Sequence, residues 1–83
     1  MYEIVRRDYG PVSSDYQVAH EGQYRASIAI AGHQDSRCKF VSVHVLGNYQ
    51  PLDATEKAAI AQTVHQWASA TLAWAEKPIR IVI

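Results

Sequence analysis

The sequence predicts an α+β fold, in which an antiparallel β-meander of about four to five strands packs on one long amphipathic α-helix. Apolar and polar residues alternate along much of residues 2–46, which is the period-two pattern of half-buried strands. An Ala-rich segment after Pro51 then repeats apolar residues with the 3.6-residue period of a helix. Alternation resumes at Ile79, so the expected element order is β-β-β-β-α-β.

The expected strands cover residues 2–7, 16–20, 24–30, 37–46 and 79–83. Gly10-Pro11 ends the first strand, and Glu21-Gly22 joins the second to the third in a tight turn. Residues 32–36 are expected to form a loop. Two sets of apolar residues, each of one parity, mark the side expected to face the core: Tyr24, Ala26, Ile28 and Ile30 in one strand, and Val41, Val43 and Val45 in the next.

The helix is expected to start after Asp53 and to run to about Ala75, since Pro78 cannot continue it. Asp53 and Glu56 have capping-box spacing, in which the Asp53 side chain caps the first turn and the Glu56 side chain reaches back. The predicted core stripe consists of Ile60, Val64, Trp67, Thr71 and Trp74, with Ala68 and Ala75 beside it.

Length and composition predict one domain, residues 1–83, with 48 % hydrophobic residues and a formal net charge of zero. This balance argues against bulk electrostatic binding of nucleic acid and does little to keep copies of the chain apart. The single cysteine, Cys38, excludes an intramolecular disulfide. No secretory signal is visible, and residues 58–75 are too polar and too short to form a typical membrane-spanning helix. We therefore expect a soluble, cytoplasmic protein.

Residues that carry catalysis or bind metals form no recognisable pattern. His33, Cys38 and His44 are the only local cluster of zinc-ligand types, and a straight strand would hold Cys38 and His44 roughly 20 Å apart. No serine lies in a G-x-S-x-G context. Cys38 lies between Arg37 and Lys39, but such a residue is more often an ordinary strand cysteine. We therefore expect no enzymatic activity, no metal and no cofactor.

One face of the predicted sheet is a candidate binding surface. If the valines of residues 41–45 face the helix, then Arg25, Phe40, His44 and Arg80 share the opposite face. Phe40 and His44 could stack on single-stranded bases while the guanidinium groups meet phosphates. The alternative is a mildly apolar surface that is buried in a dimer, in contact with another protein or covered by the N-terminal segment.

The helix is a second candidate interface, because residues 58–75 carry no charge. Ala59, Ala70 and Trp74 represent its small and aromatic surface residues. Charged residues are depleted and aromatic residues enriched at interface cores, which favours self-association. High helix propensity of alanine is the simpler explanation for the same composition.

The motifs Gly-x-Tyr-Arg-Ala-x-Ile at residues 22–28 and Asp-Ala-x-Glu-x-Ala at residues 53–58 resemble those of small uncharacterised bacterial proteins that combine a β-meander with an Ala-rich helix. The layout is also similar to antitoxins with a HicB-like partial RNase H fold, without the separate DNA-binding segment that many of them carry. The resemblance implies a fold more than an activity. The leading hypothesis is a non-enzymatic protein-interaction or regulatory module that forms a homodimer, and the alternative is a single-stranded nucleic-acid binder.

Overall fold

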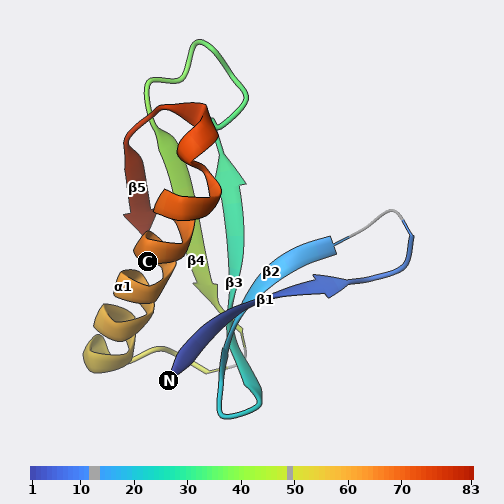
Figure 1. Ribbon diagram of the computed structural model, residues 1–83. Coiled ribbons are helices and arrows are strands. Elements are labelled where there is room, and N and C mark those ends of the chain that lie inside the picture. Colours follow the sequence, from blue (N-terminus) through green and yellow to red (C-terminus); the bar gives the residue numbers. More distant parts are fainter. Residues whose placement is uncertain (12–13, 49) are drawn as a thin grey trace.

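The computed structural model describes residues 1–11, 14–48 and 50–83, and it confirms the predicted fold class and element order (Figure 1). The elements are β1 (Tyr2–Asp8), β2 (Ser14–His20), β3 (Gln23–Ala31), β4 (Val41–Gly47), α1 (Ala54–Thr71), a 3-10 turn η1 (Ala73–Ala75) and β5 (Ile79–Val82).

The five strands form one sheet in the order β1-β2-β3-β4-β5. The first four strands are an antiparallel meander, as predicted. β5 instead runs parallel to β4, with Val41 opposite Ile79 and His44 opposite Val82. The parallel direction follows from the connection, because α1 carries the chain back along the sheet before β5 begins.

The turns explain where the strands stop. Glu21 and Gly22 have φ values of 51° and 79°, so both lie in the left-handed region that a type I′ hairpin turn requires. The predicted strand start at Arg37 is wrong, because β4 begins only at Val41. The preceding loop is held by Lys77, whose Nζ donates to the carbonyl oxygens of Gly32 and Asp35 at 2.8 and 2.6 Å.

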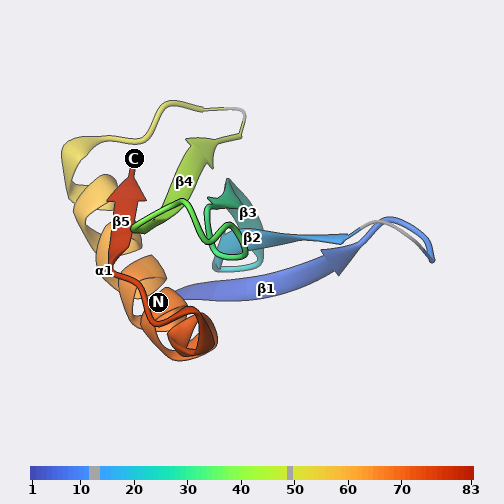
Figure 2. The ribbon, with the colours of Figure 1, turned by 90° about the horizontal axis from the view of Figure 1, so that it is seen from above.

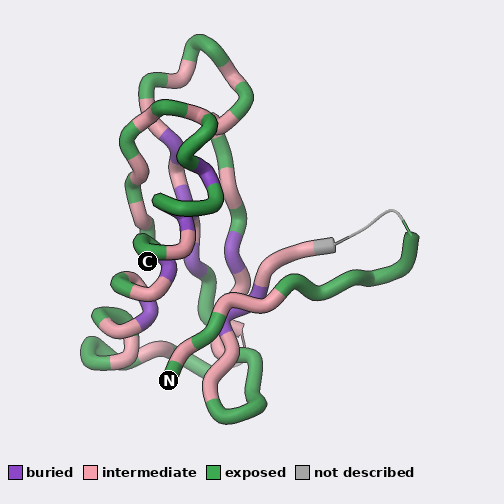
Figure 3. Tube along the Cα trace, viewed as in Figure 1, coloured by how far each residue is buried: buried purple, intermediate pink, exposed green. Residues whose placement is uncertain are grey.

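A single helix covers a single face of the sheet, and the core lies between them (Figure 2). The fully buried side chains of largest volume are Ile60, Val18, Val41, Val43 and Val64. The outer halves of β1 and β2 extend away from α1, and residues 6–11 are all exposed (Figure 3). One half of the hairpin β1–β2 therefore packs in the core, and its outer half projects away from the helix.

The helix begins as predicted, since the Asp53 side chain accepts a hydrogen bond from the Glu56 N–H at 2.8 Å. Its predicted apolar stripe is only half correct. Ile60 and Val64 are buried, but Thr71 and Trp74 are exposed, and the row continues instead through Ala68 and Leu72. The reason is that α1 ends at Thr71 and the chain tightens into η1, which turns Trp74 out of the helical stripe.

Replacing Ile60 by alanine removes a side chain with no exposed surface and is expected to lower the free energy of unfolding by about 2–5 kcal/mol. Urea unfolding followed by circular dichroism measures the loss. The control is Gln62→Ala on the exposed side of α1, which is expected to change stability by less than about 0.5 kcal/mol. Equal losses in the two variants would contradict the placement of the core.

Candidate functional site

The sheet face opposite α1 is a candidate surface, because no described element crosses it (Figures 1 and 2). We call it the open face. Several large side chains on it are exposed, among them Leu46 at 59 %, Val82 at 49 % and Tyr24 at 43 %. Tyr24 and Leu46 line the same hollow, and adjoining exposed apolar side chains make this face a candidate binding surface.

Three of the four residues predicted for the binding face lie on the open face. His44 and Arg80 point outward because their neighbours Val43 and Ile81 point toward the core. The Arg80 guanidinium carbon lies 3.8 Å from the centre of the Phe40 ring. This cation–π contact orients the guanidinium, and it also covers one side of the aromatic ring.

The fourth residue, Arg25, lies elsewhere. The pairing of β2 with β3 shifts between Val18 and Ala19, where Val18 faces Ala26 but Ala19 faces Tyr24. Arg25 is the extra residue of this bulge, and it lies on the helix side of the sheet. Its predicted position on the open face is therefore wrong, as is the predicted inward position of Tyr24, which is exposed.

Arg25 joins the sheet to the first turn of α1. Its Nε and Nη2 donate to the two carboxylate oxygens of Glu56 at 2.9 and 2.7 Å, and the Tyr2 hydroxyl donates to Glu56 at 3.0 Å. The hydrogen bonds from Arg25 hold the pKa of the Glu56 carboxyl below its usual value. Burial, followed by the bond to Glu56, raises the pKa of the Tyr2 hydroxyl. The Glu56 side chain therefore accepts hydrogen bonds from sheet residues and does not complete the predicted capping box.

A second feature of the open face is an arginine held between two tyrosines. The Arg7 guanidinium carbon lies 5.0 Å from the Tyr9 ring centre and 4.9 Å from the Tyr24 ring centre. Both rings are exposed, at 50 % and 43 %. The arrangement fixes a cation on the surface while leaving its N–H groups available for an acceptor.

Beside Arg7 is a hollow of about 370 Å³ with a polar floor. Gln17 is only 4 % exposed, and its Nε2 donates to Asp15 at 2.9 Å and to the Ser27 hydroxyl at 3.1 Å. Asn48 donates to the Gln17 amide oxygen at 3.2 Å and accepts from Ser27 at 2.9 Å. The bonds hold the Gln17 amide in place, while the Asp15 Oδ1 beside it is buried and has no hydrogen-bond partner among the described residues. The cluster gives the open face a polar centre.

Sequence reasoning missed this cluster for a physical reason. Gln17 alternates with Val18, so its position alone indicates a solvent-facing strand residue. Its burial depends on the register that sets it opposite Ser27 and on the loop residue Asn48. Gln17 shares odd-numbered strand positions with Arg7 and Ser27, and all three side chains point away from the helix. This shared parity was the one available signal.

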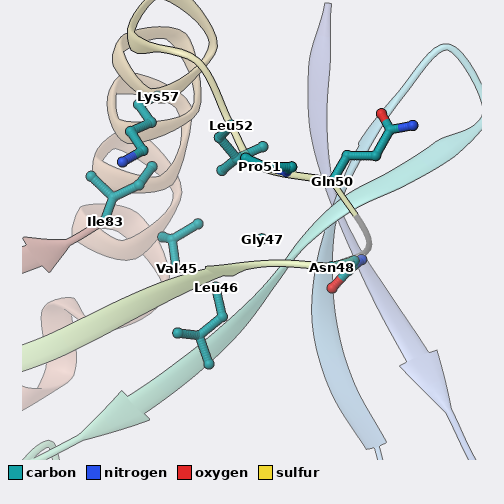
Figure 4. A pocket seen from close by; sticks show the side chains of 9 residues that line it. All are labelled: Val45, Leu46, Gly47, Asn48, Gln50, Pro51, Leu52, Lys57 and Ile83. Atoms are coloured by element: carbon teal, nitrogen blue, oxygen red, sulfur yellow. The ribbon is translucent and has the colours of Figure 1, made fainter.

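A groove of about 500 Å³ lies where β5 stops (Figure 4). The pairing of β4 with β5 ends at His44, so residues 45–47 extend beyond β5. Figure 4 shows Ile83 pointing toward Lys57 and Val45 pointing into the same groove, while Leu46 points away from it. Leu52 and Pro51 line its other side.

The predicted helix interface is divided in the structure. Ala59 is half-buried and lines a hollow together with Tyr2 and Arg25. Ala70 is exposed on α1. Trp74 lies in η1 and is 59 % exposed, with its ring 6.0 Å from that of His33 in an edge-to-face arrangement. The three residues therefore do not form one helical surface.

Within residues 1–11, 14–48 and 50–83, no three His, Cys, Asp or Glu side chains converge as ligands for a metal ion. His33, Cys38 and His44 are thus not brought together. In the same described part of the chain, no helix is long and apolar enough to cross a membrane.

No protein-family model matches the chain, and no curated protein or solved structure is similar to it.

The ion pair of Arg25 and Glu56 predicts a pH dependence of stability. The folded-state pKa of Glu56 is depressed, so the stabilisation is present above the unfolded pKa of about 4.3 and is lost as the pH falls through the folded pKa. Glu56→Gln should therefore lower the urea midpoint clearly at pH 7 and progressively less toward pH 3.

The control for this measurement is Glu3→Gln, since Glu3 is exposed on β1 and makes no salt bridge within the described residues. Its midpoint should follow that of the parent protein at each pH. A Glu56→Gln loss that stays constant between pH 7 and pH 3 would show that the carboxylate charge does not contribute.

Proposed function

We propose that the protein is a small bacterial, cytoplasmic protein-interaction or regulatory module without enzymatic activity, which forms a homodimer and binds a second protein on its open face. The observation that carries this proposal is the uncovered sheet face with its exposed Leu46, Val82 and Tyr24. Exposed apolar and aromatic side chains beside polar groups are typical of protein interfaces.

Two arginines on the open face can bind an acidic partner, while the one carboxylate beside them, Asp15 opposite Arg7, already accepts hydrogen bonds from Tyr9 and Gln17. Arg7 and Arg80 make no salt bridge with any described residue. Each guanidinium stacks on aromatic rings, which restricts the side chain and lowers the entropy lost when a carboxylate binds. Arginine and tyrosine are also the residues most enriched among interface hot spots.

The net charge supports self-association alongside this binding. Eight basic residues balance eight acidic residues, so two copies of the chain do not repel each other through their net charge. The exposed side of α1 adds no charge between residues 58 and 71. Neither property favours a strictly monomeric state.

Single-stranded nucleic acid is the less favoured occupant of the open face. Phe40, His44 and Arg80 are present there, but Arg25 is neutralised by Glu56 on the other side of the sheet. The Arg80 guanidinium covers one side of the Phe40 ring, on which a base would stack. Two arginines on a chain of zero net charge provide little attraction for a polyanion.

The test replaces both arginines of the open face. Affinity capture with the parent protein, followed by purification of the captured acidic protein, gives a partner whose Kd is measured by calorimetry. The double variant Arg7→Glu/Arg80→Glu should bind it at least about tenfold more weakly. Arg6→Glu is the matched control, because Arg6 neighbours Arg7 but pairs with Asp8 at 3.2 Å away from the open face.

Two results would overturn the proposal of a protein partner. One is equal binding by the parent protein and the double variant. The other is a salt-sensitive shift of the Ala29, His44 and Leu46 amide resonances on adding single-stranded oligonucleotides, which the same double variant abolishes; that result would assign the face to nucleic acid.

A further inference from the structure

We propose that two copies of the chain pair edge to edge through β5, antiparallel about a two-fold axis at Ile81, so that their sheets become continuous. This inference rests on the self-association proposed above and specifies its surface. The β5 edge is one end of the sheet, and no described strand pairs with its outer side.

The hydrogen-bond pattern identifies the backbone groups that are free. The Val41 N–H donates to the Pro78 carbonyl at 2.8 Å, and Val41 lies opposite Ile79. In a parallel ladder with this register, the backbone groups of Arg80 and Val82 point toward β4. Those of Ile79 and Ile81 point outward, so the free edge offers alternating donors and acceptors to another strand.

The two edges of the sheet differ in how they are protected. β1, at the other end, has the sequence Tyr-Glu-Ile-Val-Arg-Arg-Asp, in which four of seven residues are charged. β5 has the sequence Ile-Arg-Ile-Val, with one charge and no proline. Short length, charged residues, prolines and bulges are the usual devices that limit edge pairing; β5 is short, with four residues, but it has a single charge and no proline.

The sequence of β5 fits a second copy of itself. In the proposed register, Ile81 lies opposite the partner's Ile81, and their N–H and C=O groups bond to each other. Arg80 then lies opposite the partner's Val82, so the two arginines do not face each other across the strand pair. On the helix side, isoleucine meets isoleucine; on the open face, the aliphatic stem of arginine meets valine.

The pairing also covers apolar surface that the single chain exposes. Val82 is 49 % exposed and Ile83 is 39 % exposed. Ile79 and Ile81 are half-buried and pack against the core from the edge of the sheet. Their remaining exposed surface faces the second copy in the proposed dimer.

An axis perpendicular to the sheet places both α1 helices on one side and both open faces on the other. The binding surface of the dimer is then one sheet that crosses the two-fold axis, with an Arg80 on each side of it. The assembly closes at two copies, because its outer edges are the two charged β1 strands.

The first measurement combines sedimentation velocity over a concentration series with amide hydrogen exchange. As the dimer forms, the Ile79 and Ile81 amides should become protected, because their N–H groups point outward in the monomer. The Val82 amide already points to β4, so its protection should not depend on the Ile81 contact and serves as the internal control.

Two substitutions at one exposed position test the register. Val82→Lys places a cation opposite the partner's Arg80 twice in the dimer, and the Kd of dimerisation should rise about tenfold. Val82→Glu places a carboxylate there, and the Kd should stay equal or fall. Urea midpoints of both variants at monomeric concentration check that the substitutions leave the single chain folded.

The outcomes separate this inference from the proposal on which it depends. A monomer at every concentration overturns both the self-association and the β5 interface. A dimer in which the two Val82 variants have equal Kd values and the Ile81 amide stays unprotected overturns the β5 interface alone. Weaker dimerisation of Val82→Lys than of Val82→Glu, with concentration-dependent protection of Ile81, is the expected result.

Discussion

One helix can cover only one face of a five-stranded sheet, and the rest of the structure follows from this constraint. Val41, Val43 and Val45 of β4 face α1 and are almost entirely buried. Their neighbours on β4, including His44 and Leu46, face the other way, where no described element covers them. The helix thus provides the core, and it leaves the opposite face to side chains that interact only with each other or with a partner.

A single irregularity decides which residues occupy each side near the β2–β3 turn. The bulge at Arg25 sends this arginine to Glu56 on α1 and sends Tyr24 to Arg7 on the open face. The same bulge therefore lets Arg25 tie the helix to the sheet and lets Tyr24 complete an aromatic-arginine group on the other side. Without the bulge, alternation would leave a cation on the open face and a tyrosine over the helix.

The sequence was sufficient to predict what depends on local periodicity and on turn chemistry. The four-strand meander, the Glu21-Gly22 turn and the Asp53 cap are all decided within a few residues. The position of Arg25 was not predictable in this way, because a bulge depends on how two strands pair. The Gln17 cluster likewise depends on Ser27 and Asn48, which are distant in sequence. The C-terminal half of the helical stripe failed because α1 ends at Thr71, before Trp74.

The parallel pairing of β5 with β4 also has a consequence for how the chain folds. The hairpins of the meander close over short loops, whereas β4 and β5 are separated by more than thirty residues, including all of α1. Contacts between distant segments carry the largest loop-closure cost and form late. Until the ribosome has released Ile79, β4 is itself an edge strand, and Val41 and Val43 lack the neighbours that β5 later provides. The newly synthesised chain is therefore most exposed to mispairing in the interval between the synthesis of β4 and that of β5.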